Sequence, residues 1–241
     1  MLKGLIFDIN GTVTDIYTSE SDDDIYRMTA NFLDYYQIRI APEILREEYF
    51  SILRRQKKES LEEFPEFDVI ALFAEIMQKY GTKKYKHPSA ETLALLFRAA
   101  SRYKLELYDG VLPTLNKLSK NYLISAVSDG QKIWAEAELH SVGLDRFFWH
   151  VIVSSSYGFR KPDPRMFHMA LEQMNLQAHE VIFVGNDMYR DIAGAHDAGL
   201  KTVFFRSNQG EQNFAGAEPD YIIYNFPQLL EAVAFLERQM N

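Results

Sequence analysis

The sequence predicts an α/β protein: a doubly wound parallel sheet with an inserted all-helical domain. A buried-strand pattern opens the chain, and short apolar runs alternate with amphipathic helical stretches from residue 105 onward, which is typical of parallel sheets. Between these regions, apolar residues recur at helical spacing and glycine is scarce. We therefore expect one domain made of residues 1–16 and 105–241 and a second made of residues 17–104.

The first predicted strand ends in a carboxylate. Leu5, Ile6, Phe7 and Ile9 form an apolar run that surrounds Asp8 and stops at a Gly-Thr turn, as expected for a strand buried on both faces. In open α/β sheets the reactive crevice lies beyond the carboxyl ends of the strands. Asp8 is therefore a candidate nucleophile or metal ligand; the alternative is an Asp that caps the next helix.

The middle of the chain reads as four or five helices. Stretches around residues 25–36 and 44–53 have helical periodicity, and two further helices are expected at 67–80, where Gly81 ends the helix, and at 89–103. No strand is expected between residues 19 and 103.

The remaining chain alternates between helices and strands. The expected strands are 122–127, 150–154, 181–184, 201–205 and 221–223. The expected helices are 111–119, 131–141, 165–175, 191–198 and 226–239. This order places each helix as a crossover between parallel strands.

Composition narrows the functional classes. The 241 residues are 47% hydrophobic, enough for one ordinary domain with a well-buried core or two modest ones. No cysteine is present, which excludes disulfides and thiolate chemistry. The net charge of −8 argues against nucleic acid or an acidic membrane as the main partner. No long apolar segment is present, so we expect a soluble, cytoplasmic protein.

Polar residues at other strand ends are expected to converge on Asp8. Ser128 ends one strand, and Lys161 lies in a loop stiffened by two prolines. Asp187 and Asp191 lie four residues apart after another strand, a spacing that places two carboxylates on one side of a helical turn and suits Mg²⁺. Taken singly, these residues also fit a helix cap, a surface lysine, and an N-cap followed by a first-turn acid.

In combination they resemble a known family. Phe-Asp-x-x-Gly-Thr-x-x-Asp at residues 7–15, Ser128, Lys-Pro-Asp-Pro at 161–164 and Gly185 to Gly199 are similar, in order, to the four motifs of the haloacid dehalogenase-like (HAD) hydrolase superfamily. The resemblance covers the whole chain. It implies a Rossmann-like core, with residues 17–104 as a helical cap of the subfamily I type.

The resemblance also implies roles for individual residues. The implied catalytic residues are Asp8, Asn10 and Lys161. The implied phosphate-binding residues are Gly11, Thr12, Ser128, Asp129 and Lys161. The implied Mg²⁺ ligands are Asp8, the main-chain carbonyl of Asn10, and Asn186, Asp187 and Asp191 from the fourth motif. Cap residues that could contact substrate are Tyr35, Tyr36, Arg46, Arg54 and Arg55.

Two asparagines depart from the family pattern. Asn10 stands where phosphatases of the family have an Asp that exchanges a proton with the leaving group and the attacking water, and Asn186 replaces a common Asp of the fourth motif. A positioned acid–base group contributes about 10²–10⁴-fold. We expect a Mg²⁺-dependent phosphatase for a small metabolite, weak on alkyl phosphates, acting as a monomer or homodimer. The alternatives are a 2-haloacid dehalogenase acting on a halogenated metabolite and a non-catalytic protein that binds a phosphorylated ligand.

Overall fold

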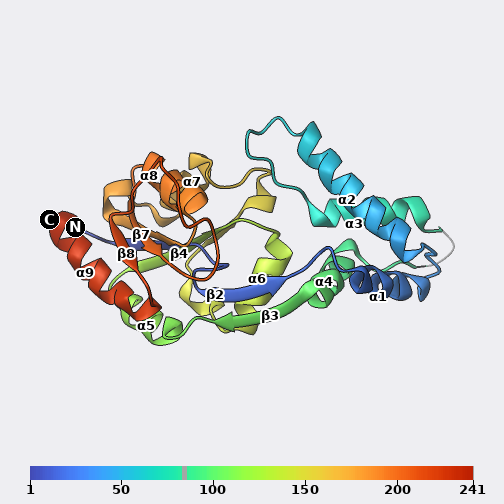
Figure 1. Cartoon of the computed structure of the whole chain (residues 1–241), viewed down its shortest axis with the longest axis horizontal. Coiled ribbons are helices and arrows are strands. Elements are labelled where there is room, and N and C mark those ends of the chain that lie inside the picture. The colour runs from blue at the N-terminus through green and yellow to red at the C-terminus, as the bar shows by residue number, and fades with distance from the viewer. Residues whose placement is uncertain (83–85, 241) are drawn as a thin grey trace.

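A computed structural model describes residues 1–82 and 86–240 of the chain. Its centre is a parallel sheet (Figure 1). The strand order in this sheet is β5-β4-β1-β6-β7-β8. The strands are β1 (Gly4–Phe7), β4 (Leu123–Ser128), β5 (Val151–Val153), β6 (Val181–Gly185), β7 (Lys201–Phe205) and β8 (Tyr221–Ile223). Every neighbouring pair is parallel, so the predicted doubly wound sheet is confirmed.

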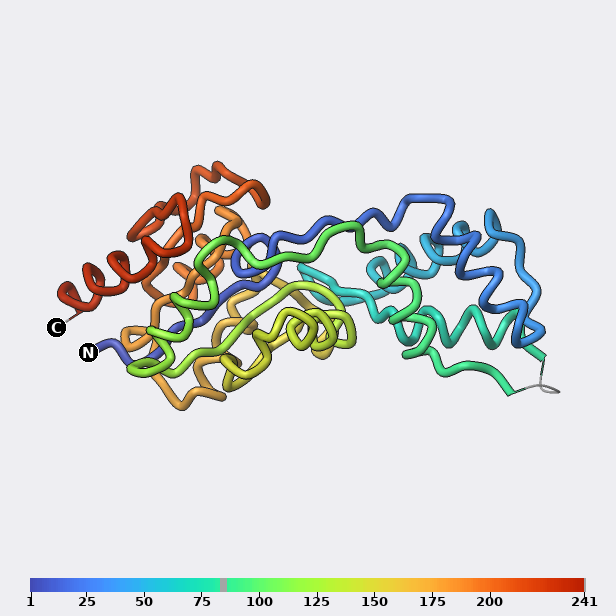
Figure 2. Tube along the Cα trace, turned by 90° about the horizontal axis from the view of Figure 1, so that it is seen from below, coloured from blue at the N-terminus to red at the C-terminus, as the bar shows by residue number. Residues whose placement is uncertain are grey.

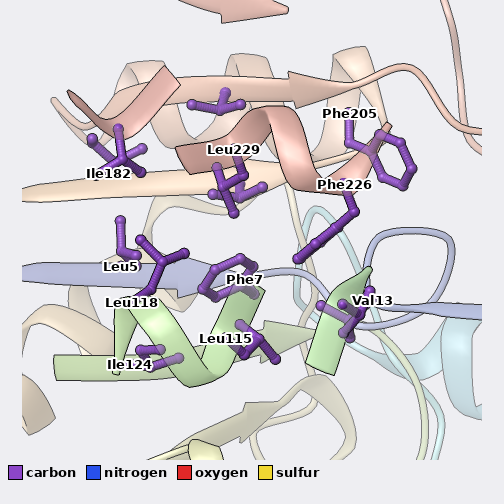
Figure 3. Close-up of a cluster of buried hydrophobic side chains, with 14 of the residues drawn as sticks. Leu5, Phe7, Val13, Leu115, Leu118, Ile124, Ile182, Phe205, Phe226 and Leu229 are labelled. Atoms are coloured by element: carbon purple, nitrogen blue, oxygen red, sulfur yellow. The ribbon is translucent and has the colours of Figure 1, made fainter. Parts of the chain in front are cut away.

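Strand β1 is buried on both faces, as its unbroken apolar sequence predicts. Its side chains alternate between two cores: Leu5 and Phe7 face one, and Ile6 faces the other. Figure 3 shows Phe7 beside Phe226, which lies on the segment leading into α9. β1 pairs with β4 on one side and β6 on the other, so the residue that follows it lies at the middle of the sheet edge.

Helices cover both faces of the sheet. They are α5 (Val111–Leu118), α6 (Lys132–Ser141), α7 (Pro164–Met174), α8 (Gly194–Asp197) and α9 (Leu229–Met240). Each strand and helix predicted from residue 111 onward is present. One differs in form: the helix expected at 191–198 begins earlier, as a π-helical turn Met188–Ala193 that continues into α8. Within residues 1–82 and 86–240, no helix has the length and apolarity needed to cross a bilayer.

The described residues of the inserted unit, 17–82 and 86–104, form four helices, which confirms its predicted helical character. They are α1 (Asp23–Asp34), α2 (Pro42–Glu59), α3 (Val69–Tyr80) and α4 (Ala90–Ser101). Their core is aromatic: Tyr26, Tyr49, Phe73 and Phe97 are fully buried, and the rings of Tyr49 and Phe97 stack 4.7 Å apart. These helices form one end of an elongated molecule, and the amino terminus and α9 lie at the other end (Figure 2).

A two-stranded antiparallel ribbon joins the helices to the sheet (Figures 1 and 2). It consists of β2 (Thr14–Thr18) and β3 (Arg102–Leu107). The expectation of no strand between residues 19 and 103 is therefore wrong at its end, because the helix predicted over 89–103 stops at Ser101 and β3 follows at once. The proposed domain boundaries, after residues 16 and 104, fall within this ribbon.

The helical unit also contacts the sheet domain directly. Phe64, Pro65 and Glu66 run beside residues 158–160: the Glu66 N–H donates to the Gly158 carbonyl at 2.9 Å, and the Arg160 N–H donates to the Phe64 carbonyl at 3.0 Å. Because residues 158–160 lie directly before Lys161, the helical unit contacts the segment that positions the lysine.

Candidate active site

The carboxyl ends of β1, β4 and β6 meet at one edge of the sheet, where the predicted site residues gather. Asp8 follows β1 directly, and its N–H donates to the Val184 carbonyl of β6 at 2.9 Å. Its side chain is buried. The backbone of the sheet therefore fixes the Asp8 carboxylate between two neighbouring strands.

Lys161 joins the carboxylates of this site. Its ammonium group donates to Asp8 Oδ1 at 2.6 Å, to Asp191 Oδ1 at 2.7 Å and to the Val127 carbonyl at 3.1 Å. Burial disfavours the charged lysine, but the charges of Asp191 and Asp8 outweigh that penalty and raise the pKa of Lys161 above its usual value. Lys161 is therefore a fixed positive charge beside Asp8.

Thr12 connects Asp8 to the fourth motif. Its hydroxyl lies 3.0 Å from Asp8 Oδ2 and 2.9 Å from Asn186 Oδ1, and its single proton can be donated to either oxygen. Gly11 makes this approach possible: its φ is +89°, and a Cβ there would lie 2.3 Å from Asn186 Nδ2. The Gly-Thr pair thus brings Asn186 beside the Asp8 carboxylate.

Asn10 lines the same cavity as Asp8 but carries no exchangeable acid. Its Oδ1 accepts a hydrogen bond from the Thr14 hydroxyl at 3.2 Å. An amide neither binds an extra proton nor releases one near neutral pH. Proton transfer at this position is therefore absent.

Asp191 and Asp187, which the sequence offers equally as metal ligands, occupy different environments. Asp191 Oδ2 accepts the N–H groups of Asn186 and Asp187 at 3.0 and 3.1 Å, and Gly185 leaves the space that its side chain fills. Burial raises the pKa of Asp191, although Lys161 opposes the rise. Asp191, and not Asp187, shares the Lys161 ammonium with Asp8.

Asp187 instead caps the π-helical turn. Its Oδ1 accepts the N–H groups of Tyr189 and Arg190, at 3.1 and 2.7 Å, and its Oδ2 pairs with the Arg190 guanidinium at 2.8 Å. Burial disfavours the charge, but these hydrogen bonds outweigh it and lower the pKa of Asp187. Its carboxylate is therefore ionised and already bonded away from Asp8.

Ser128 and Asp129 end β4 beside the lysine. Ser128 is buried, and its hydroxyl makes only a long contact of 3.4 Å with the Asp129 carbonyl. Asp129 Oδ1 accepts the main-chain N–H of Lys161 at 3.0 Å. Asp129 therefore contacts Lys161 directly, whereas no hydrogen bond joins Ser128 to Lys161 within the described residues.

Six of the predicted site residues line a cavity of about 700 Å³ between the sheet domain and the helical unit: Asp8, Asn10, Asp129, Lys161, Asn186 and Asp191. Gly11, Thr12, Ser128 and Asp187 are not part of its lining. The helical side contributes Lys57, Glu66, Phe67 and Arg98, among others. None of the cap residues suggested from the sequence lines this cavity; one of them, Tyr35, is exposed to solvent. The suggestion failed because helical periodicity identifies a buried face but not which part of the surface borders the sheet domain.

Sequence reasoning also missed two arginines of this cavity. Arg160 directly precedes Lys161, and Arg190 lies between Asp187 and Asp191. Both arginines lie within motifs that the sequence analysis identified. Their positions next to a motif lysine or aspartate could have indicated that they line the site. Arg190 pairs with Asp187 and lies 3.5 Å from Asp129 Oδ2.

Comparison with known proteins places the chain in a family. Residues 2–199 match the haloacid dehalogenase-like hydrolase model. Glyceraldehyde 3-phosphate phosphatase of Pyrococcus furiosus is 38% identical over 133 residues, which are 54% of this chain and 54% of that protein, so the match spans about half of its length. The protein of that name from Methanocaldococcus jannaschii is 27% identical over 99% of this chain and 100% of its own.

A solved structure shares the fold over nearly the whole chain. The 2-haloacid dehalogenase of Pseudomonas syringae superposes with a TM-score of 0.69 at 23% identity, covering 98% of this chain and 99% of that one. The parallel sheet, the site at the strand ends and the family match all point to the same family. The chain belongs to the haloacid dehalogenase-like hydrolases.

Proposed function

We propose that this protein is a phosphatase that hydrolyses a small phosphorylated metabolite through an aspartyl-phosphate on Asp8. The observation that carries the proposal is the Asp8 carboxylate, held by the Lys161 ammonium at 2.6 Å and by the Thr12 hydroxyl at 3.0 Å on the floor of a polar cavity. The relatives named as phosphatases of small phosphorylated compounds support it.

In the proposed reaction a carboxylate oxygen of Asp8 attacks phosphorus as the phosphorus–oxygen bond to the leaving group breaks. The leaving oxygen takes up one proton, which the water of the next step replaces. Lys161 would neutralise negative charge on the phosphoryl oxygens, and Ser128, whose hydroxyl has only a long contact in the structure, is the proposed donor to one of them. Water then attacks the phosphorus of the aspartyl-phosphate and releases inorganic phosphate and the Asp8 carboxylate.

The oxygen donors around Asp8 are compatible with Mg²⁺, a hard cation that prefers carboxylates and carbonyls. Asp8, Asp191, the Asn186 amide oxygen and the Asn10 carbonyl would hold it, and the ion would supply further positive charge to the phosphoryl group. Among the described residues, no three His, Cys, Asp or Glu side chains are grouped as a metal site. Because Asn10 and Asn186 are amides, we propose that Mg²⁺ binds weakly.

The cavity supports a small, polar substrate. Two cations of its lining, Lys57 of the helical unit and Arg160 of the sheet domain, form no ion pair within the described part of the chain. They favour a substrate with a second anionic or strongly polar end. We propose no nucleic acid or membrane partner, and a monomer or homodimer as the active form.

The experiment that tests this function is pre-steady-state hydrolysis of p-nitrophenyl phosphate and acetyl phosphate, with and without Mg²⁺. We expect turnover that Asp8→Asn abolishes, and faster hydrolysis of alkyl phosphates in Asn10→Asp, because the substitution places an acid–base group at residue 10. A burst followed by slow turnover would place the deficit in hydrolysis of the aspartyl-phosphate.

The same assay separates the alternatives. If the protein and Asn10→Asp are both inert with every phosphate ester, phosphatase chemistry is refuted. Halide release from 2-haloacids without metal would then support a dehalogenase, and stabilisation by phosphorylated ligands without turnover would support a binding protein.

A further inference from the structure

Asp129 has an oxygen for which the structure provides no hydrogen-bond partner. Its side chain is only 9% exposed. Oδ1 accepts the Lys161 N–H at 3.0 Å, whereas Oδ2 is buried and makes no hydrogen bond within the described chain. Arg190 Nη1 lies 3.5 Å from Oδ2, close enough for an ion pair but beyond the usual range of a hydrogen bond. A buried carboxyl oxygen left in this state is costly unless a ligand or a proton completes it.

The position of Asp129 relates it to the reaction. It lines the same cavity as Asp8 and Asn10. Lys161 contacts both carboxyl groups, through its main-chain N–H to Asp129 and through its ammonium group to Asp8. The two carboxyls are therefore separated by at most the length of one lysine residue and its two hydrogen bonds, and a substrate in the cavity can contact both.

The surroundings of Asp129 favour a bound proton. Burial raises the pKa of this carboxyl, and the nearby charge of Asp191 adds to the rise. The cations Lys161 and Arg190 oppose it but do not cancel it. A phosphate ester in the cavity brings further negative charge, which favours the protonated form again.

We propose that Asp129 is the catalytic residue that carries the proton which Asn10 cannot carry. The inference rests on the phosphatase function proposed above. Its position is unlike that of Asn10, because it follows β4 rather than β1. The acid–base group of this protein is thus the carboxyl at residue 129, and the amide at residue 10 takes no part in proton transfer.

The proton balance of this step is simple. As Asp8 bonds to phosphorus and the phosphorus–oxygen bond to the alcohol breaks, the leaving oxygen takes the proton of Asp129, which gives ROH and an Asp129 carboxylate. Water then attacks phosphorus and gives a proton to that carboxylate. The bond between phosphorus and Asp8 breaks, inorganic phosphate leaves, and both side chains return to their starting states.

The test is Asp129→Asn, which retains an oxygen for the Lys161 N–H but cannot transfer a proton. We expect alkyl phosphate hydrolysis to fall about 10²-fold or more, while acetyl phosphate, whose leaving group needs no proton, changes by no more than a few-fold. The dependence of kcat/KM on leaving-group basicity should steepen across a series of aryl phosphates. In the Asn10→Asp background, which has a second acid, the effect of Asp129→Asn on alkyl phosphates should nearly vanish.

Asp220→Asn is the matched control. Asp220 makes hydrogen bonds with Lys201 and Thr202 at the amino end of β7, away from the cavity. The same chemical change there should leave the ratio of alkyl to acetyl phosphate rates unaltered.

Four results would each overturn the proposal. An equal loss of activity on all substrates in Asp129→Asn would show that Asp129 only positions Lys161. No loss of activity on any substrate would show that Asp129 has no role in the reaction. Either result overturns this proposal but not the phosphatase function, which is tested separately by the activity of the unmodified protein. Inactivity of unmodified protein and Asn10→Asp on every ester would overturn both. If Asp129→Asn fails to fold, the unmodified protein decides: its alkyl-to-acetyl rate ratio must fall as rising pH removes the Asp129 proton, and a constant ratio refutes the proposal.

Discussion

Replacing Lys161 with Met tests how the carboxylates of the site are held together. The ammonium is 2% exposed and lies 2.6 Å from Asp8 and 2.7 Å from Asp191. Met has a similar length and no charge, so Lys161→Met leaves two buried carboxylates without their shared cation. Removing one partner of a buried ion pair costs about 3–5 kcal/mol.

This cost predicts a measurable loss of stability. For a chain of this size, 1 kcal/mol changes Tm by about 2–4 °C, so the variant should melt roughly 6–20 °C below the unmodified protein. Burial already raises the pKa of Asp191, and the variant would lose the Lys161 charge that opposes this rise. Acids with a raised pKa in the folded state lose stability as pH rises through that pKa, so the deficit should be smaller at pH 5 than at pH 8.

Mg²⁺ should rescue the variant, because the ion can replace the missing positive charge. A ligand at 100 times its Kd stabilises by about 2.7 kcal/mol. Thermal melting with EDTA and with Mg²⁺ measures the loss of stability and its rescue. Lys132→Met is the control, because Lys132 is exposed in a surface pair with Glu136. This substitution should change the free energy of unfolding by less than about 1 kcal/mol. A Lys161→Met variant that melts within 2 °C of the unmodified protein, or whose Tm ignores Mg²⁺ at pH 8, would refute this reasoning.

Two further predictions follow from other contacts. Asn186→Asp adds a carboxylate beside Asp8 and should tighten Mg²⁺ binding roughly ten- to hundred-fold, because one more unit charge near the ion adds up to about 4 kcal/mol of attraction at an effective dielectric constant of 20. Titration calorimetry measures the Kd, and an unchanged Kd would show that the ion binds elsewhere. Arg98→Met breaks a buried pair in which Arg98 Nε lies 2.7 Å from Glu138 Oε1 between the helical unit and the sheet domain, and should cost about 3–5 kcal/mol in urea unfolding, most of which Arg98→Met with Glu138→Leu should recover.

The sequence was sufficient to predict the sheet and the convergence of its strand-end residues. Leu5 and Phe7 belong to an uninterrupted apolar run, and such a run predicts a central strand wherever the chain later places it. Once parallel strands are predicted, their carboxyl ends must meet at one edge. Asp8, Lys161 and Asp191 therefore come together in the structure as the pattern of the sequence indicates.

The ribbon β2–β3 was beyond sequence reasoning for a physical reason. Its residues are mostly half-buried, so they show neither a continuous apolar run nor a clear alternation. β3 also follows α4 without a turn residue between them. Strand pairing between segments so far apart in sequence is a tertiary property, and no local signal specifies it.

The distinction between Asp187 and Asp191 was likewise hidden. Both carboxylates follow β6 at a spacing that suits one face of an α-helical turn, but the turn is π-helical. Asp187 caps this turn, whereas Asp191 reaches back to the N–H groups that follow the strand. Backbone geometry, which the sequence does not display, decides which acid joins Lys161.

The two amides give this site a consistent charge balance. With Asn10 and Asn186 neutral, Lys161 has two carboxylates to neutralise, Asp8 and Asp191, and it donates a hydrogen bond to each. A third or fourth carboxylate at residues 10 and 186 would add repulsion that one ammonium could not balance, and a metal ion would then be required to hold the group together. The same substitutions that weaken the expected Mg²⁺ site therefore reduce the negative charge that a phosphate ester meets beside Asp8.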